Sequence, residues 1–310
     1  MKVDGNRVAF RHWLGAKALL GLRWYARRIP EERVPAAGDR VGMLMRAISP
    51  RHARLVLTNL RLALGKERSE EDLQAIALQS YRYGGRSLLE FLRMPYMTKE
   101  QIEAKVTLVN TKYLDEALAR GKGCILLTAH YGNWELVGAR LAAAGYPMNV
   151  IARSQRDPKV TDLLTGVREK VGMRVIDRDQ GAKGALRALR RNGIVAILLD
   201  QNAGTNGVFV DFFGLPAATA TGPAALARAT GAAVAPIFSR REPDNHHIGE
   251  CLPLLELQFT DDKASDDVRN TQRMVALIEE HIRLRPEQWF WMHKRWKTRP
   301  PDHPEPVYHE

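Results

Sequence analysis

Cysteine is scarce in this chain: the 310 residues include two, Cys124 and Cys251. So few cysteines cannot build the disulfide framework of a small secreted domain, and a chain of this length buries enough apolar surface to fold without one. Cys124 stands inside the apolar run Gly123–Leu127, which favours a small buried side chain over a reactive thiol. Cysteine usage therefore fits a reducing compartment.

Long apolar runs are also missing. No segment approaches the roughly 20 apolar residues that span a bilayer, and the N-terminus lacks the pattern of a secretory signal. The nearest candidate, Phe10–Tyr25, is interrupted by Arg11, Lys17 and Arg23. Its mixture of aromatic and cationic side chains suits a helix lying in the interface of an anionic membrane. A packed amphipathic helix explains the same pattern equally well.

Several catalytic signatures are absent. The chain has no Walker loop, no Gly-x-Ser-x-Gly elbow, no His-Glu-x-x-His and no Cys-x-x-Cys. Nucleotide hydrolysis, serine hydrolysis and zinc chemistry therefore lose support. His246-His247 follows a turn-like Pro-Asp-Asn segment and predicts a solvated turn rather than a metal pair. We expect no metal and no cofactor.

Positive charge is abundant, with a formal net charge of +12 and a pI near 9.9. Such a balance indicates a polyanionic partner, which includes nucleic acid, an anionic membrane, a phosphorylated lipid or an acidic protein. A generally basic, well-solvated surface is the simpler alternative. Charge alone does not choose among them.

The first hundred residues read as helices. Ser69 predicts an N-cap, Thr98 and Gln101 form a capping-box pattern, and Gly84-Gly85 is expected to interrupt the helix between them. Farther along, short apolar segments alternate with helical ones. The expected strands are Cys124–Thr128, Met148–Ala152, Met173–Ile176, Ile194–Leu199 and Ala232–Phe238, with an edge strand at Ile248–Leu257.

This alternation predicts an α/β fold, a mostly parallel central sheet flanked by helices with a helical N-terminal cap. We expect residues 1–310 to form a single domain. Residues 1–110 would be a membrane-associated helical cap, and residues 111–310 the α/β catalytic core.

The segment Thr128–Glu135 carries the strongest local signal for chemistry. His130 follows a buried strand, at the sheet edge where ligands bind in open α/β folds, and Glu135 falls in the first turn of the next helix. A carboxylate bound to one ring nitrogen leaves the other free to take a proton from a hydroxyl. The alternative is a structural histidine followed by a glutamate that the helix dipole favours.

Six segments of the chain, in order, resemble the bacterial lipid A biosynthesis (late, or secondary) acyltransferases, within the His-x4-Asp/Glu lipid acyltransferases. They are RHARLVLTNLRLALG (Arg51–Gly65), Tyr81–Met94, ILLTAHYGNWE, DQNAGTNGVFVDFFG (Asp200–Gly214), ATATGPAALARATGAAVAP (Ala218–Pro236) and QWFWMHKRWKTRP. From the first to the last they span roughly four-fifths of the chain, and this is far more specific than a single His-x4-Glu.

The resemblance implies transfer of an acyl chain from acyl carrier protein to a hydroxyl of a phosphorylated, acylated glucosamine disaccharide. It places the reaction at the cytoplasmic face of the inner membrane. Many family members begin with a more convincing spanning helix, but charged residues interrupt this one, so we expect peripheral or monotopic attachment to an anionic membrane surface. It assigns the general base to His130, the carboxylate partner to Glu135 and the family's functional arginine to Arg168. Nucleic acid is not an expected partner.

Three further residues are candidates for substrate contacts. Arg153 follows the second strand and suits a phosphate or an oxyanion, although a surface arginine is equally consistent. Asp200 follows another strand and either shapes the site or caps a loop. Asn133 turns the chain, caps the next helix and lies within the motif.

Two rival interpretations remain open. One is a related acyltransferase with a different acceptor, such as a lysophospholipid, a glycolipid mannoside or an aminolipid. The other is a non-catalytic basic protein that binds membrane or nucleic acid. The basic and aromatic tail Trp289–Arg299, with His293 inside it, is expected to pack against the cap or contact lipid headgroups.

Overall fold

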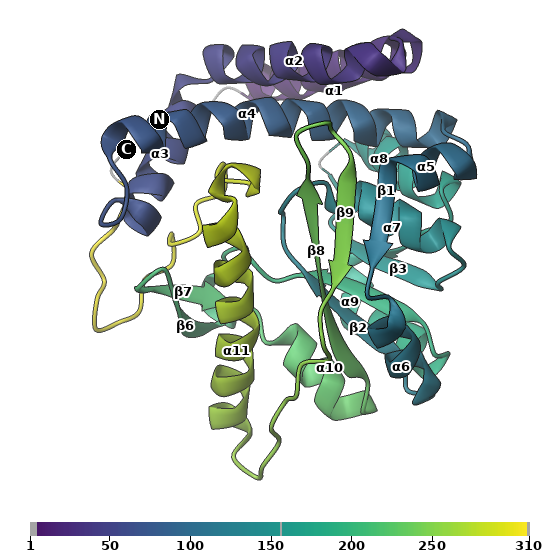
Figure 1. Cartoon of the computed structure of the whole chain (residues 1–310). Helices are drawn as coiled ribbons and strands as arrows, with labels where there is room; N and C mark the ends of the chain where they lie inside the picture. Colours follow the sequence, from purple (N-terminus) through teal and green to yellow (C-terminus); the bar gives the residue numbers. More distant parts are fainter. Residues whose placement is uncertain (1–4, 156, 309–310) are drawn as a thin grey trace.

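The computed structural model of the chain describes residues 5–155 and 157–308. A seven-stranded sheet with the order β1-β9-β8-β2-β5-β3-β4 forms its centre (Figure 1). The strands are β1 Val106–Val109, β2 Cys124–Thr128, β3 Met148–Ala152, β4 Arg174–Asp177, β5 Ile194–Leu198, β8 Ala233–Arg241 and β9 His247–Cys251. Strands β8 and β9 pair antiparallel, and every other pair in this sheet is parallel.

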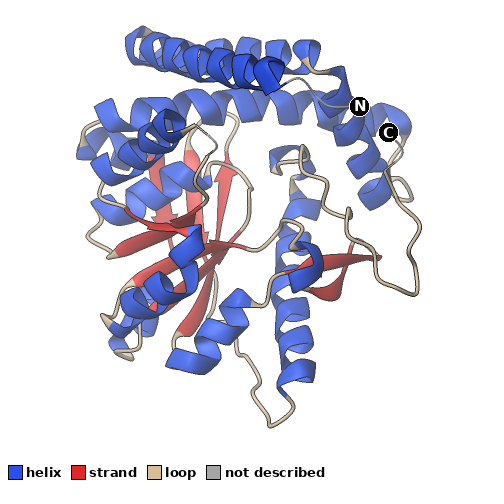
Figure 2. Ribbon diagram, turned by 180° about the vertical axis from the view of Figure 1, so that it is seen from behind, coloured by secondary structure: helices blue, strands red, loops and turns tan. Residues whose placement is uncertain are grey.

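Helices cover both faces of the sheet, as the view from behind shows (Figure 2). They are α6 Lys112–Ala119, α7 Trp134–Ala143, α8 Pro158–Lys170, α9 Gly181–Arg190, α10 Gly222–Thr230 and α11 Lys263–Leu284. Strand β2 is buried throughout: Ile125 and Leu127 belong to one apolar cluster, while Cys124 and Leu126 belong to the other. A strand buried on both faces needs an uninterrupted apolar sequence, which is what this segment has.

The N-terminal region is helical, with α1 Gly5–Arg28, α2 Val34–Ile48, α3 Pro50–Leu64, α4 Glu70–Arg93 and α5 Lys99–Lys105. Helices α1 and α2 lie along the long helix α4 at the top of Figure 1. The expected helix Phe10–Tyr25 falls inside α1, but side chains before residue 15 lie outside the described residues. Among the helices described, none combines the length and the apolar character needed to cross a bilayer.

The interruption expected at Gly84-Gly85 was wrong, because α4 runs through both residues. A side chain at Gly85 would place its Cβ 2.1 Å from the carbonyl oxygen of Gly38, and one at Gly42 would approach the carbonyl oxygen of Tyr81 to 1.9 Å. Glycine is therefore present for the close crossing of α2 and α4, and the packing outweighs its low helix propensity.

The predicted α/β architecture is confirmed, as are the N-cap at Ser69 and the capping box of Thr98 with Gln101. The edge position expected for Ile248–Leu257 was wrong: β9 lies between β1 and β8, and β1 takes the edge. Strand β1 of the central sheet falls within residues 1–110, the range predicted to form the helical cap. The sequence pattern did not predict the antiparallel hairpin of β6 Val208–Phe212 and β7 Leu215–Thr219.

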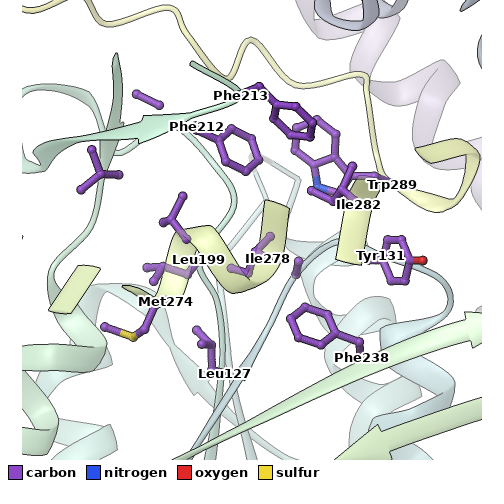
Figure 3. Close-up of a cluster of buried hydrophobic side chains, with 14 of the residues drawn as sticks. Leu127, Tyr131, Leu199, Phe212, Phe213, Phe238, Met274, Ile278, Ile282 and Trp289 are labelled. Carbon is purple, nitrogen blue, oxygen red and sulfur yellow. The ribbon is translucent and has the colours of Figure 1, made fainter. Parts of the chain in front are cut away.

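The tail after α11 is part of the core. Trp289, Trp291 and Trp296 are each at most 2% exposed. Phe212 from the β6–β7 hairpin packs edge-on against Trp289, with ring centroids 5.7 Å apart (Figure 3). These three tryptophans are therefore buried in the protein, and the lipid contact considered for this tail does not apply to them.

Candidate active site

The geometry of the segment after β2 places His130 at the carboxyl edge of the sheet. Gly132 has a φ of +61°, and a Cβ there would lie 1.9 Å from the carbonyl oxygen of Ser239. Only glycine accepts both the left-handed backbone and this close approach to β8. The side chain of Asn133 then accepts a hydrogen bond from the backbone N–H of Leu136 and starts α7. The turn holds the His130 ring above the sheet.

Asp200 is the carboxylate partner of His130. The ring Nδ1 lies 2.8 Å from Asp200 Oδ1, and the backbone N–H of His130 donates to Oδ2 at 2.9 Å. Strands β2 and β5 are parallel neighbours with Thr128 opposite Leu198, so the residues that follow them meet at one edge. Because an ionised carboxylate only accepts, Nδ1 carries the proton and Nε2 of the neutral ring is the free acceptor.

Asp200 is buried behind His130 and remains ionised. Burial raises the pKa of its carboxyl, but the His130 ring and the hydrogen bonds from His130 and Trp289 outweigh burial and lower the pKa to about 2. Trp289 Nε1 donates to Oδ2 at 2.7 Å. The backbone N–H of Phe290 also donates to the carbonyl oxygen of His130 at 2.9 Å, so the C-terminal tail holds both partners.

The other ring nitrogen of His130 faces Gln201. The side-chain amide nitrogen of Gln201 lies 3.3 Å from His130 Nε2. Trp134 meets the imidazole edge-on with centroids 5.0 Å apart, and Phe290 lies 6.1 Å from it on centroids. The ring is thus oriented by a carboxylate on one nitrogen, flanked by aromatic rings, and open to a polar group on the other nitrogen.

Glu135 pairs with Arg168 rather than with His130. Arg168 Nε lies 3.0 Å from Glu135 Oε2, and its terminal nitrogen lies 2.5 Å from Oε1. The pair is mostly shielded, and the Arg168 guanidinium also lies 5.4 Å from the ring centroid of Phe91. Helices α7 and α8 bring the two residues together. The ion pair is bidentate, and this geometry fixes the orientation of the guanidinium.

A cavity of about 1090 Å³ opens at these residues. Its polar lining includes His130, Glu135, Arg168, Arg153 and Gln201. Apolar side chains from β2, β3, α7, α8, β5 and α10 line the remainder, among them Leu126, Leu141, Met148, Leu164, Leu198 and Leu226. The volume lies slightly above the usual range of about 300–1,000 Å³ for small-molecule sites. An apolar chamber with a histidine in its lining suits a long-chain substrate.

The predicted residues divide into two groups. His130, Glu135, Arg168 and Arg153 all line the cavity, whereas Asp200 is buried behind His130. Asn133, expected to contact substrate, is 1% exposed and is committed to capping α7 and to Glu90.

The histidine pair at 246–247 is not the solvated turn that was expected. His247 is fully buried in β9, and His246 lies 2.8 Å from the hydroxyl of Thr107. Within residues 5–155 and 157–308 no group of three or more His, Cys, Asp and Glu side chains is arranged to hold a metal ion.

A buried charged cluster supports the turn that carries His130. Glu90 on α4 accepts from Arg241 at 2.7 and 2.6 Å and from the Asn133 side chain at 2.7 Å. Burial raises the pKa of the Glu90 carboxyl. Arg241 and His247 lower it by more, so the pKa lies well below its ordinary value. Burial lowers the pKa of His247, so Arg241 is the cation that balances Glu90. The cluster joins α4 to β8, β9 and the start of α7.

Sequence reasoning missed three residues at the site. Gln201 lies beside His130 Nε2, Trp289 binds Asp200, and Glu90 anchors Asn133. Gln201 was detectable, because it directly follows Asp200 after a buried strand. Trp289 and Glu90 are far from the motif along the chain, and no local pattern connects them to it.

Comparison with known proteins shows the family of the chain. A family model described as bacterial lipid A biosynthesis acyltransferase matches residues 5–298. The lipid A biosynthesis lauroyltransferase of Escherichia coli (strain K12) is 29% identical over 291 residues, which cover 93% of this chain and 92% of that protein. The myristoyltransferase of the same organism is 26% identical over 306 residues, covering 96% and 92%.

A third relative carries a different name. The phosphatidylinositol mannoside acyltransferase of Mycobacterium tuberculosis (strain CDC 1551 / Oshkosh) is 27% identical over 232 residues, which cover 73% of this chain and 71% of that protein. All three relatives are named as enzymes that transfer an acyl group. The chain is therefore an acyltransferase and belongs to the bacterial lipid A biosynthesis acyltransferase family.

Proposed function

We propose that the protein transfers a fatty acyl chain from an acyl-carrier-protein thioester to a hydroxyl of a phosphorylated glycolipid, a lipid A precursor. One observation carries the proposal. His130, with Nδ1 held by the buried Asp200, stands at the polar end of a largely apolar cavity. The names of the Escherichia coli relatives support the lipid A acceptor.

His130 acts as the general base in this reaction. Nε2 accepts the proton of the acceptor hydroxyl while its oxygen attacks the thioester carbonyl carbon. The tetrahedral intermediate then collapses, the carbon–sulfur bond breaks, and the thiol leaves with the proton returned by the imidazolium. A positioned base typically contributes about 10²–10⁴-fold to the rate. No covalent enzyme intermediate is needed, because a thioester is already activated.

The roles of the carboxylates follow from their hydrogen bonds. The dyad expected from the motif paired His130 with Glu135. In our proposal Asp200 orients His130 and stabilises the imidazolium, while Glu135 holds Arg168 at the cavity wall. A fixed guanidinium there suits a phosphate group or the developing oxyanion. Arg153, exposed at the rim of the cavity, suits a phosphate group of either substrate.

The amide of Gln201 lies where the acceptor oxygen must arrive. A tetrahedral intermediate places both the acceptor oxygen and the oxyanion within a few ångströms of His130 Nε2. In our proposal the Gln201 amide nitrogen, 3.3 Å from Nε2 in the free protein, donates to one of these oxygens during the reaction.

We propose peripheral attachment of α1 and α2 to the cytoplasmic face of the inner membrane. Trp24 is 60% and Ile48 is 71% exposed, and Leu20 and Leu44 are exposed beside them on the same two helices. The Arg28 guanidinium lies 4.1 Å from the Trp24 ring centroid. Exposed apolar side chains beside cations suit the headgroup region of an anionic bilayer.

The decisive experiment is acyl transfer by the purified protein, read by mass spectrometry. The donor is an acyl carrier protein thioester and the acceptor is the tetra-acylated, Kdo-bearing lipid A precursor. We expect a mass gain of one acyl group that disappears in His130→Ala and persists in His246→Ala, a histidine outside the cavity. No gain with folded protein overturns the lipid A assignment, and a gain that survives His130→Ala overturns the mechanism.

A mannoside glycolipid is the second candidate acceptor, because phosphatidylinositol mannoside acyltransferases are among the relatives. The same assay with a phosphatidylinositol mannoside in place of the lipid A precursor distinguishes the two. Transfer to the mannoside alone would leave the chemistry at His130 intact and change the acceptor.

A further inference from the structure

One side of α9 is strongly positive. Lys183, Arg187 and Arg190 follow one another at i, i+4 and i+7, which places them on one side of a helix with 3.6 residues per turn. Arg191 continues the row at the end of the helix. All four side chains are exposed, and none of them forms an ion pair or hydrogen bond within the described part of the chain.

The rest of α9 is committed to the fold and the cavity. Gly181, Ala185 and Leu189 are buried against the protein. Ala182 and Leu186 line the cavity that contains His130. At 100° per residue, the cavity-lining positions lie between the buried side and the charged side. The positive row therefore borders the cavity directly.

Two arginines at the sheet edge extend this surface. Strands β3 and β4 are parallel with Ala152 opposite Asp177, so Arg153 and Arg178 leave the sheet side by side. Both are exposed, and both line the cavity. Asp177 itself accepts from the hydroxyl of Ser154 and from a backbone N–H. From residue 177 to residue 191 the chain has five cationic side chains and two carboxylates, Asp177 and Asp179.

We propose that this surface docks an acidic carrier protein that delivers the acyl group as a thioester on a flexible arm. The α9 surface is defined by Arg153, Arg178, Lys183, Arg187, Arg190 and Arg191. The inference rests on the proposed function and names the place where the donor binds. Opposite charge across such a surface speeds encounter and fixes orientation, and the arm then reaches His130 through the adjoining cavity.

The composition of the α9 surface favours a soluble partner over a membrane. None of the exposed large apolar side chains among the described residues lies between residues 153 and 191. The surface of α1 and α2, by contrast, combines the exposed side chains of Trp24 and Ile48 with arginines. A membrane surface takes both apolar and cationic groups, whereas an acidic protein is steered and oriented chiefly by the cations. Helix α9 contacts β3, β4, β5 and α10, and α1 and α2 pack on α4 (Figure 1).

The test compares two double variants with matched charge change. Arg187→Glu/Arg190→Glu reverses two charges on the α9 surface without touching the cavity lining. Lys66→Glu/Arg68→Glu reverses two exposed charges in the α3–α4 connection that form no side-chain ion pair or hydrogen bond among residues 5–155 and 157–308. For dodecanoyl acyl carrier protein we expect KM to rise by about tenfold or more in the α9 variant, with kcat kept. The control variant should match the wild type.

A small donor separates docking from chemistry. Dodecanoyl-pantetheine carries the same thioester without a protein, so both variants should use it as well as the wild type does. If the α9 variant uses carrier protein as well as the wild type does, the docking inference fails and the proposed reaction stands. If the wild type uses pantetheine thioester but not carrier protein, the docking inference and the proposed donor both fail, and only the acyl transfer at His130 stands. If the wild type uses neither donor, the proposed function fails.

Binding provides a readout without turnover. Isothermal titration of unacylated holo acyl carrier protein should show salt-sensitive binding that Arg187→Glu/Arg190→Glu abolishes and Lys66→Glu/Arg68→Glu leaves unchanged. Equal binding by both variants overturns the inference. So does a result in which the α9 variant binds carrier normally but loses binding to phosphatidylglycerol vesicles, which would assign the surface to lipid.

Discussion

Asp200 holds His130 at two atoms: Oδ1 lies 2.8 Å from the ring Nδ1, and Oδ2 accepts the backbone N–H of the same residue at 2.9 Å. The carboxylate therefore fixes the position of the main chain and the orientation of the imidazole together. This is a stronger constraint than a single hydrogen bond to the ring, because neither part can move without breaking a bond to the buried charge.

Asp200→Asn should remove activity without removing the fold. An asparagine amide can donate to Nδ1, which stabilises the tautomer with its proton on Nε2, the wrong nitrogen for a base. The equivalent change in a serine protease triad lowers kcat on the order of 10⁴-fold. We expect a loss of about 10²–10⁴-fold in kcat, with little change in KM. Steady-state transfer assays with circular dichroism as the folding control check this, and near-normal kcat would contradict it.

The ionisation of Asp200 should also contribute to stability in a defined pH range. Its pKa is lowered to about 2 from the ordinary value of 3.8, so the stabilisation is present above the unfolded pKa and is lost as pH falls through the folded one. The shift corresponds to about 2 kcal/mol, of which about 1 kcal/mol is lost by pH 3.

Urea unfolding of the wild type and Asp200→Asn between pH 6 and pH 3 measures this contribution. We expect the stability difference between the two proteins to narrow by about 1 kcal/mol over that range. A difference that is constant with pH would contradict ionisation of Asp200 as its source.

Glu135 and Arg168 should behave as a unit in a double-mutant cycle. Their two-pronged contact positions Arg168 at the cavity, so removing either partner leaves the other misplaced. We expect Glu135→Gln and Arg168→Met each to lower kcat/KM by about 10–100-fold, and the double variant to lose no more than the worse single variant. Fully multiplicative losses would show instead that the two residues act separately.

The position of His130 was predictable from the sequence, but its partner was not. An apolar run followed by Thr-Ala-His identifies a strand end, and the same reasoning places Asp200 after another strand. Which strands are neighbours depends on the tertiary order, and β2 lies between β5 and β8. A spacing of five residues made Glu135 the obvious carboxylate, although Asp200 is the one that the sheet brings to the ring.

The same limit explains the errors in the fold. Gly84-Gly85 was expected to break the helix because helix propensity depends on the residue type alone. Glycine is required at position 85 because the backbone of α2 passes directly against it. Strand β9 looked like an edge because β1 is only four residues long and follows directly after α5. Periodicity and capping patterns predicted most helices and strands correctly, because those features depend on neighbouring residues alone.

Gln201→Leu tests the residue beside His130 Nε2. Leucine keeps much of the volume but removes the amide that lies 3.3 Å from the ring. If the amide stabilises an oxygen in the transition state, kcat should fall by about 10²-fold or more while KM for either substrate changes little. A rise in KM alone would assign Gln201 to substrate binding and contradict a transition-state role.

Glu90→Gln should destabilise the whole fold. Glu90 is 2% exposed and balances the buried Arg241, so the substitution leaves an uncompensated guanidinium between α4 and β8. Breaking a buried pair by removing one partner typically costs about 3–5 kcal/mol. Glu70→Gln is the matched control, because Glu70 makes a similar contact with Arg61 at the surface and its loss should change stability far less.

Urea unfolding at pH 7 measures both glutamate variants. Because Glu90 also binds Asn133 at the start of α7, partial unfolding near His130 should accompany the loss of stability in Glu90→Gln. Hydrogen exchange of the 129–136 amides would report it as faster exchange in Glu90→Gln than in Glu70→Gln. Equal stability of the two variants would mean that the Glu90–Arg241 pair contributes no more than a surface contact, and that the turn carrying His130 is held by other interactions.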